Sequence, residues 1–261
     1  MESNVDLHVH TYYSDGTLSP TEIIKWAKKS KLDQIAITDH DGIDGIQEAL
    51  IAGEALEIVV IPGIEFSVDE SNGVGMHMLG YYIDVFNKEL NNKLEYIKQK
   101  RKERNDKLIT VFTDLGYPLV YEDMKKRGAS NYIGKPDFAR GLINKGYISK
   151  FSEAFEEGHF LRSEKAREIK KEKLSAKEAI ELICGAGGIA VLAHPMKVTG
   201  LSGDYFIELE SLIIKLKGYG LKGMECFYPE HSEEDTMRLV NLAEKYKLHM
   251  TKGSDYHGPK D

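Results

Sequence analysis

Histidine and carboxylate residues stand at both ends of the chain and recur at intervals between them. The chain opens with Asp6-Leu7-His8-Val9-His10 and closes with Gly253-Ser254-Asp255-Tyr256-His257. Imidazole and carboxylate groups are common ligands of divalent zinc, manganese and iron. The repetition predicts a metal site assembled from distant parts of the chain. The intervening groups are Thr38-Asp39-His40, Gly63-Ile64-Glu65, Met76-His77 and Ala193-His194-Pro195.

His8 and His10 are separated by one residue in an apolar, β-branched run. Side chains on a strand repeat every two residues, so both rings would point to the same face. A single pair of this kind is a weak signal, because a buried, hydrogen-bonded histidine is commoner than a metal ligand. The wider pattern is stronger, because six of the nine histidines fall at expected strand ends. They are His8, His10, His40, His77, His194 and His257.

Seven apolar runs predict seven strands, and helical patterns lie between most of them. Strands that alternate with helices favour an α/β fold with parallel pairing and helices on the outside of the sheet. Seven such strands predict a closed or nearly closed barrel. The expected strands are Val5–Thr11, Gln34–His40, Ile58–Phe66, Met76–Ile83, Gly188–His194, Gly223–Tyr228 and Leu248–Asp255.

The alternation is interrupted between about residues 88 and 174, where the pattern is helical throughout. We therefore expect residues 1–87 and 175–261 to form the barrel domain, and residues 88–174 to form an all-helical insertion that faces the substrate as a lid or cap.

The net charge of −7 conceals an asymmetry. Residues 88–174 carry 21 basic and 14 acidic residues, whereas the remainder carries 14 basic and 28 acidic ones. An acidic body repels polyanions, so stable binding of duplex nucleic acid is not expected. The basic insertion would face a small anionic substrate, although a solvated helical surface explains most of its charges.

No apolar run reaches the length of a membrane span, and residues 1–4 lack the features of a signal peptide. The two cysteines, Cys184 and Cys226, form no Cys-x-x-Cys unit, and we expect two buried, reduced thiols. These observations predict a cytoplasmic protein without a membrane partner.

The combined motifs resemble those of the PHP (polymerase and histidinol phosphatase) superfamily. The opening residues 6–16, the Thr-Asp-His, Gly-Ile-Glu and Ala-His-Pro groups and the closing residues 253–257 match in order. The resemblance implies a distorted (β/α)7 TIM-like barrel with a trinuclear metal centre. The metals are usually manganese, iron or zinc, and we expect manganese first. The insertion and Asp15 resemble the features of one subgroup, which includes nucleoside 3′,5′-bisphosphate phosphatases and 5′-to-3′ exoribonucleases.

The resemblance also implies a ligand set. Asp39 would not bind a metal itself but would orient one of the ligands. The first metal would be held by His8, His10, Glu65 and Asp255, the second by Glu65, His77 and His194, and the third by Asp15, His40 and His257.

The implied activity is that of a metal-dependent phosphoric ester hydrolase. Clustered metals lower the pKa of a bridging water and stabilise the oxygens of an in-line displacement, so a metal-bridging hydroxide would attack phosphorus. The expected substrates are phosphate monoesters of small nucleotides, above all nucleoside 3′,5′-bisphosphates, and the ends of short oligonucleotides such as RNA.

Four further residues are candidates around the substrate. Lys135 and Arg140 lie in a Gly-Lys-Pro-Asp segment that resembles Gly-Arg-Pro-His of many relatives; a helix-surface role for Arg140 is equally consistent. His231 follows the sixth strand and would protonate the leaving oxygen or bind a phosphate, or else face solvent at a helix start. Glu225, within that strand, is a weaker candidate for a hydrogen bond to a ligand.

Three alternatives stay open. The substrate could be a non-nucleotide metabolite such as histidinol phosphate. An amidohydrolase also uses a His-x-His strand, although its usual bridging lysine at a strand end has no counterpart here. A catalytically silent PHP regulatory module would lack ligands, whereas every ligand position in this chain holds a competent residue.

Overall fold

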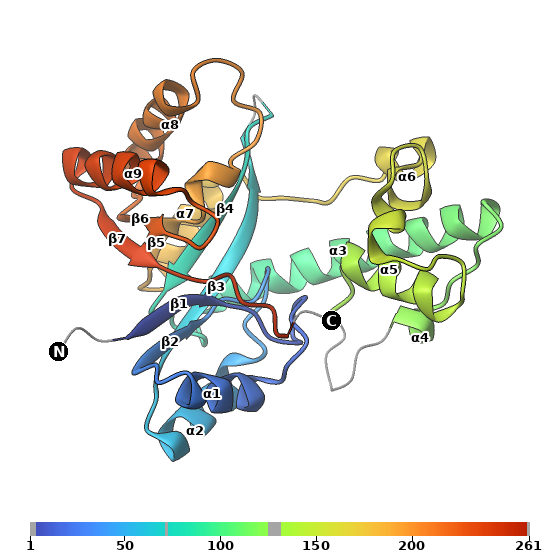
Figure 1. Cartoon of the computed structure of the whole chain (residues 1–261), viewed down its shortest axis with the longest axis horizontal. Helices are drawn as coiled ribbons and strands as arrows, with labels where there is room; N and C mark the ends of the chain where they lie inside the picture. The colour runs from blue at the N-terminus through green and yellow to red at the C-terminus, as the bar shows by residue number, and fades with distance from the viewer. Residues whose placement is uncertain (1–3, 71–72, 125–131, 260–261) are drawn as a thin grey trace.

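The computed structural model describes residues 4–70, 73–124 and 132–259. Seven strands form one sheet in which the spatial order follows the sequence from β1 to β7 (Figure 1). All seven expected strands are therefore present, with ends that differ by a few residues. The strands are β1 (Val5–Val9), β2 (Gln34–Ile37), β3 (Val59–Asp69), β4 (Gly75–Tyr81), β5 (Ile189–Leu192), β6 (Gly223–Phe227) and β7 (His249–Lys252).

The pairing is parallel except at β4, which runs antiparallel to both β3 and β5. The expectation of parallel pairing throughout was therefore wrong at this strand. Only five residues separate the end of β3 from the start of β4. A parallel crossover needs a dozen residues or more, so a connection this short permits only a hairpin.

The sheet curls until its first and last strands meet. The backbone N–H of His10 donates to the carbonyl oxygen of Tyr256 at 2.9 Å, and the N–H of Tyr256 donates to the carbonyl of His8 at 3.3 Å. These bonds lie at the carboxyl ends of β1 and β7. The fold is a nearly closed, distorted TIM-like barrel, and the closure joins the two ends of the chain at the edge where the strand-end histidines emerge.

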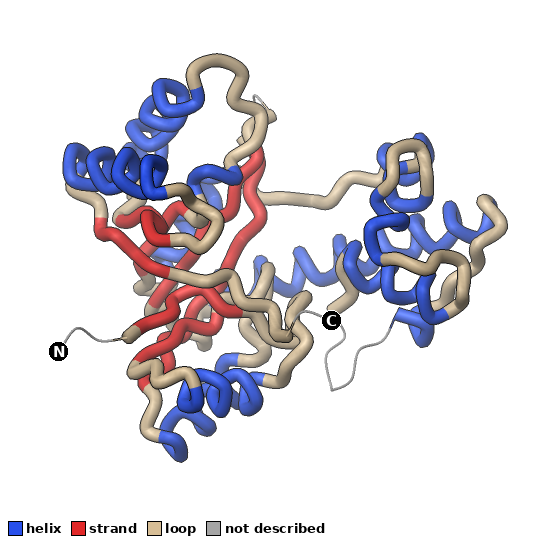
Figure 2. Tube along the Cα trace, viewed as in Figure 1, coloured by secondary structure: helices blue, strands red, loops and turns tan. Residues whose placement is uncertain are grey.

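Helices pack on the outside of this sheet, and several begin at serine caps (Figure 2). The hydroxyls of three serines each accept a hydrogen bond from the N–H three residues later, and the acidic side chain at that later position accepts one from the serine N–H. The serines are Ser19, Ser175 and Ser232. Such capping boxes satisfy the unpaired donors of a first helical turn. The outer helices are α1 (Pro20–Lys29), α2 (Ile46–Leu56), α7 (Ala176–Gly185), α8 (Tyr205–Tyr219) and α9 (Glu233–Tyr246); the short 3-10 turn η3 (Pro195–Lys197) follows β5.

Between β4 and α7, the described residues contain helices and no named strand (Figure 2). The 27-residue α3 leaves the barrel, and the extended segment after α6 returns to it (Figure 1). The helices between them pack around their own apolar cluster, in which Phe112 and Phe138 are fully buried. The elements are α3 (Lys88–Asp114), α4 (Tyr121–Met124), α5 (Lys135–Asn144), η1 (Phe151–Phe155), η2 (Phe160–Arg162) and α6 (Glu164–Glu168).

No helix among the described residues is long and apolar enough to cross a bilayer. Both cysteines are free thiols. Cys226 is buried as expected, but Cys184 is exposed, because it lies outside the buried face of α7, which includes Ala179, Ile180 and Ile183.

Candidate metal centre

Glu65 is the carboxylate on which the strand-end histidines converge. It lies within β3 and is fully buried. Its Oε1 is 2.9 Å from Nδ1 of His77 and 3.2 Å from Nε2 of His194, and its Oε2 is 2.9 Å from Nδ1 of His40. Histidines from three other segments of the sheet therefore contact one acidic side chain.

His8 and His10 project from the end of β1 onto the same side, as their two-residue spacing predicts. Nε2 of His8 is 3.3 Å from Glu65 Oε1, and Nε2 of His10 is 3.4 Å from Glu65 Oε2. The same two nitrogens lie 3.4 Å and 3.2 Å from Oδ1 of Asp255. The barrel closure thus places a residue from the C-terminal end against both rings.

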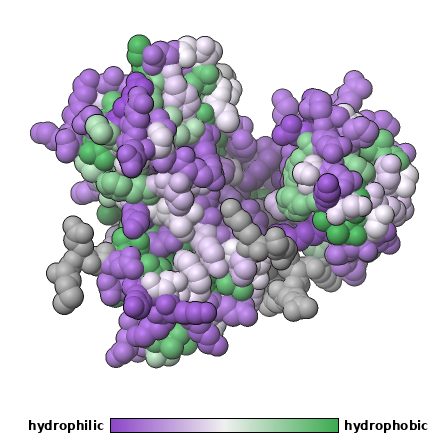
Figure 3. Space-filling model, in the orientation of Figure 1, coloured by the Kyte–Doolittle hydropathy of each residue, from purple (hydrophilic) through white to green (hydrophobic). Residues whose placement is uncertain are grey.

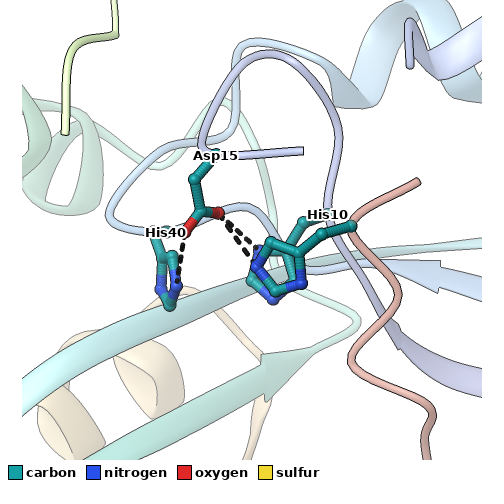
Figure 4. A group of neighbouring side chains, drawn as sticks. His10, Asp15 and His40 are labelled. Carbon is teal, nitrogen blue, oxygen red and sulfur yellow. Dashed lines mark ion pairs between the residues drawn. The ribbon is translucent and has the colours of Figure 1, made fainter. Parts of the chain in front are cut away.

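Asp15 forms the third side of the cluster. Its carboxylate lies between the rings of His10 and His40 (Figure 4). Its oxygens are 3.8 Å from Nδ1 of His10, 3.6 Å from Nε2 of His40 and 3.1 Å from Nε2 of His257. Asp15 belongs to the loop after β1 and His257 to the segment after β7, so this side also depends on barrel closure.

Two of these residues have backbone angles that non-glycine residues seldom adopt. His194 has φ of 24° and Asp255 has φ of 55°. Such conformations cost about 1–3 kcal/mol each and are typical of functional sites. Both residues lie within three positions of a strand end, and their side chains contact the cluster.

The arrangement fits bound metal ions. Five buried atoms lie at ion-pair distance from other members of the cluster but form no hydrogen bond of normal geometry among the described residues: His8 Nε2, His10 Nε2, Asp15 Oδ1, His40 Nδ1 and Glu65 Oε2. Leaving such atoms without a partner is costly, and a cation supplies one. In four groups the candidate ligand atoms lie within 4.8 Å of one another: His8, His10 and Asp255; His8, Glu65 and His194; His40, Glu65 and His77; and His10, Asp15, His40 and His257.

These groups correspond only in part to the implied three sets. The structure places His77 with His40 and His194 with His8, whereas the resemblance implies a shared site for His77 and His194. All nine implied ligands nevertheless lie in one cluster.

The cluster also determines the charge of its members. Burial alone would raise the pKa of Glu65, but His77, His40 and His8 lower it well below its usual range. Burial opposes protonation of His40, yet Glu65 and Asp15 raise its pKa to about 9. Burial and the nearby His40 lower the pKa of His10 to about 4. At neutral pH the carboxylate is ionised and His10 is neutral, which are the states a metal requires.

Glu225 on β6 lies behind the cluster and joins two of its histidines. Its Oε1 is 3.0 Å from Nδ1 of His8, and its Oε2 accepts a bond of 2.7 Å from the backbone N–H of His194. A carboxylate on the second nitrogen of a ligating histidine fixes the ring and its tautomer. The hydrogen bond to a candidate ligand that we considered for Glu225 is present.

Asp39 contacts none of the rings directly. Its carboxylate accepts bonds from the Thr11 N–H at 2.8 Å, the Thr11 hydroxyl at 2.7 Å and the Ser14 hydroxyl at 2.5 Å. It therefore holds the loop from which Asp15 extends.

The substrate candidates lie outside the cluster. Arg140 pairs with Asp137 at 2.8 Å, and Asp137 also caps α5 by accepting the Gly134 N–H. Lys135 is exposed at the start of α5. Although the residue as a whole is exposed, partial desolvation of its amine, followed by the nearby Arg104, lowers its pKa.

His231 lies beside Tyr228, with ring centroids 5.1 Å apart, and its Nδ1 is 3.2 Å from the carbonyl oxygen of Cys226. Its Nε2 is buried without a described partner. Tyr228 is a residue that the sequence did not point to. Its hydroxyl donates to Asp255 at 2.9 Å, and Lys197 contacts both that hydroxyl and Asp255.

A cavity of about 750 Å³ opens beside the cluster, although none of the nine residues lines it. Its wall includes Tyr13, Asp41, Arg101, Asn105 and Tyr132. Asp41 directly follows His40, so the cavity adjoins the site and brings it together with α3 of the insertion. The charged pattern of α3 gave no sign of which basic residues would face inward.

A model of the PHP domain matches residues 6–219. The chain belongs to the PHP domain family. Two relatives cover nearly the whole of this PHP chain. A 5′-3′ exoribonuclease of Haemophilus influenzae is 32% identical, over 99% of this chain and 92% of its own length. A 3′,5′-nucleoside bisphosphate phosphatase of Chromobacterium violaceum is 30% identical, over 98% and 88%.

A solved structure from Chromobacterium violaceum has the same fold as this PHP protein, with a TM-score of 0.85 and 30% identity over 98% of this chain and 88% of that one. It is described as an amidohydrolase with bound sulfate and no metal. In this PHP protein the central position of the cluster belongs to Glu65 rather than to a lysine.

Proposed function

We propose that this PHP-family phosphoesterase hydrolyses phosphate monoesters of small nucleotides, namely nucleoside 3′,5′-bisphosphates, and acts on the ends of short oligonucleotides. The observation that carries the proposal is the convergence of eight histidine and carboxylate side chains around Glu65. The names of the Haemophilus and Chromobacterium relatives support the nucleotide assignment.

The cluster has donors for three divalent ions, and manganese is our first choice, with iron or zinc next. His8, His10 and Asp255 would hold one ion. Asp15, His40 and His257 would hold another, while Glu65, His77 and His194 complete the set. Bound ions would supply Lewis-acid polarisation of the phosphate and a water of lowered pKa.

The remaining steps belong to side chains around the cluster. Glu225 and Asp39 orient ligands and the ligand loop, whereas Tyr228 holds Asp255. His231 is our candidate for the group that protonates the leaving oxygen. Its Nδ1 faces a carbonyl oxygen and must carry a proton, so Nε2 is the atom that takes up and donates one.

Arg140 and Lys135 stay assigned to substrate binding. Lys135 is free to move toward a phosphate as a point charge, and its amine has no carboxylate within 4 Å among the described residues. Arg140 would have to exchange Asp137 for the substrate.

A substrate panel tests the function. The metal-loaded protein should hydrolyse a nucleoside 3′,5′-bisphosphate and a 5′-phosphorylated dinucleotide with higher kcat/KM than histidinol phosphate. An amide substrate should not be cleaved. Turnover of histidinol phosphate alone would refute the nucleotide assignment, and failure to bind metal would indicate a silent PHP module. The variant Asp255→Asn should lose turnover, whereas Glu57→Gln, in an exposed residue after α2, should not.

We also propose that residues 88–174 form a separate helical unit on the barrel made by residues 1–87 and 175–261. Its own apolar cluster supports this division. The free thiols favour a reducing compartment, so we place the protein in the cytoplasm.

A further inference from the structure

Three basic side chains lie where the insertion joins the barrel, and we call them the basic cluster: Arg101, Arg104 and Lys171. The two arginines are three residues apart on α3 and so lie on neighbouring positions of that helix. Lys171 belongs to the segment that returns from α6. Figure 1 shows that α3 and this segment are the two connections between barrel and insertion.

The basic cluster reaches the edge of the candidate metal centre at two points. Asp41, which directly follows His40, is 2.7 Å from the Lys171 amine and 3.4 Å from the Arg101 guanidinium. The Lys171 amine also donates to the Ser67 hydroxyl at 2.7 Å, and Ser67 is the register partner of His77 in the β3–β4 pair. The cations therefore lie beside two of the histidines.

The positive charge of the cluster exceeds what Asp41 can neutralise. Arg104 is only 7% exposed, and its described hydrogen-bond partners are two neutral oxygens, Asn105 Oδ1 at 2.8 Å and the Ile133 carbonyl at 3.5 Å. Among the described residues no carboxylate lies within 4 Å of its guanidinium. Arg101 is 9% exposed, and its Nε is buried without a described partner. Burying cations without enough counter-charge is costly, unless a ligand supplies the missing anion.

The neighbouring cavity suits the rest of a nucleotide. Arg101, Asn105, Tyr13 and Tyr132 contribute to its wall. The Arg101 guanidinium lies over the Tyr132 ring at 4.2 Å from the centroid, which holds the planar group in one orientation. A volume of about 750 Å³ is large enough for a nucleoside-sized ligand. On the viewed face of the barrel, hydrophilic side chains predominate, with smaller hydrophobic areas between them (Figure 3).

We propose that Arg101, Arg104 and Lys171 bind a second phosphate group of the substrate, separate from the phosphate that is hydrolysed at the metal centre. This inference rests on the proposed function. Arginine presents several N–H donors in a planar fork that matches phosphate oxygens, and lysine adds a point charge. The substrate class is a nucleotide with two phosphates separated by a sugar, and the basic cluster favours it over a monophosphate.

The preference for a bisphosphate over a monophosphate tests the proposal. We compare kcat/KM for a nucleoside 3′,5′-bisphosphate with kcat/KM for the matching 3′- and 5′-monophosphates. In Arg104→Met, the ratio should fall about 10- to 100-fold, as expected when a charge-assisted bond is lost. The matched control is Lys107→Gln, which removes an exposed charge from the same helix and should leave the ratio unchanged. Lys171→Met should lower the ratio too, which guards against misfolding of the buried Arg104 variant.

A 5′-phosphorylated dinucleotide tests whether the second phosphate is a terminal phosphate or a phosphodiester of RNA. If the variants lose preference for the dinucleotide but not for the bisphosphate, the ligand is a phosphodiester of RNA rather than a terminal phosphate, and the bisphosphate assignment is overturned. An unchanged ratio in both Arg104→Met and Lys171→Met, with native circular dichroism, overturns the subsite itself.

A binding measurement separates this inference from the proposed function. Pyrophosphate should raise the Tm of the metal-free wild-type protein, and Arg104→Met should lose most of that shift while Lys107→Gln keeps it. If the metal-loaded protein hydrolyses no phosphate ester but this difference is observed, the proposed function fails and the anion site stands. Equal shifts in wild type and both cluster variants would overturn the anion site whatever the activity.

Discussion

Glu225 accepts at once from the ring of His8, at 3.0 Å, and from the backbone of His194, at 2.7 Å. This single carboxylate on β6 therefore positions two candidate ligands that emerge from β1 and from the residues after β5. Glu225 is fully buried, so both bonds are shielded from solvent.

Replacing Glu225 by Gln should weaken metal binding without removing a ligand. An amide nitrogen cannot accept the His8 Nδ1–H, so one of the two bonds is lost or the ring turns. Loss of such an outer partner typically costs 10- to 100-fold in metal affinity. Competition with a chromogenic chelator measures the change. Glu233→Gln, in the exposed first turn of α9, is the control; equal affinity in both variants would contradict the role of Glu225.

Metal affinity should rise with pH. The pKa of His40 is raised to about 9, mainly by Glu65 and Asp15 against the effect of burial, so its imidazole carries a proton at neutral pH in the metal-free protein. A metal must displace that proton, and the apparent affinity should improve roughly tenfold per pH unit below about 9. Calorimetry in buffers of different ionisation enthalpy should show proton release; binding without release would refute this.

The raised pKa of His40 predicts the opposite pH trend for the stability of the metal-free protein. A histidine whose folded pKa is raised stabilises the fold below its unfolded value of about 6.5. That contribution should disappear as the pH rises through about 9. Urea titration of the metal-free protein across this range should show a falling free energy of unfolding, and His40→Gln should flatten the fall.

His231 should matter most for poor leaving groups. If its Nε2 protonates the leaving oxygen, His231→Gln will lower kcat on a nucleoside phosphate by about 10²- to 10⁴-fold. It should have little effect on p-nitrophenyl phosphate, because that phenolate leaves without a proton. Equal losses on both substrates would assign His231 to structure instead.

Phe138→Ala should destabilise the insertion. The ring is fully buried, 5.7 Å from that of Phe112, and its loss should cost about 3–5 kcal/mol. Hydrogen exchange should show faster exchange in the insertion while metal affinity stays near wild type. Phe151→Ala, in an exposed residue of the same unit, is the control. Equal loss of protection in the barrel would refute the division into two units.

The sequence predicted much of the barrel because its signals are local. Apolar runs, serine caps and the His8-x-His10 spacing each depend on neighbouring residues, and all three appear in the structure. The antiparallel β4 was missed, although the short connection from Asp69 to Gly75 carried the signal. Attention to loop length would have corrected the pairing.

The sequence did not predict which basic side chains are buried beside the candidate metal centre. Arg101 and Arg104 look like members of a solvated helical face, since α3 is charged along its whole length. Their burial depends on which side of α3 packs against Asp41 and residues 132–133, and that is set by tertiary contacts. Tyr228 was missed for the same reason, because its link to Asp255 crosses between β6 and β7.

The hydrogen bonds that join Tyr256 to His8 and His10 have a consequence for synthesis. A ribosome delivers His8 and His10 long before Asp255 and His257, so a nascent chain has no complete site until His257 has emerged. Metal capture must then follow folding rather than guide its first steps. Only closure of the barrel brings the early and late residues together in one cluster.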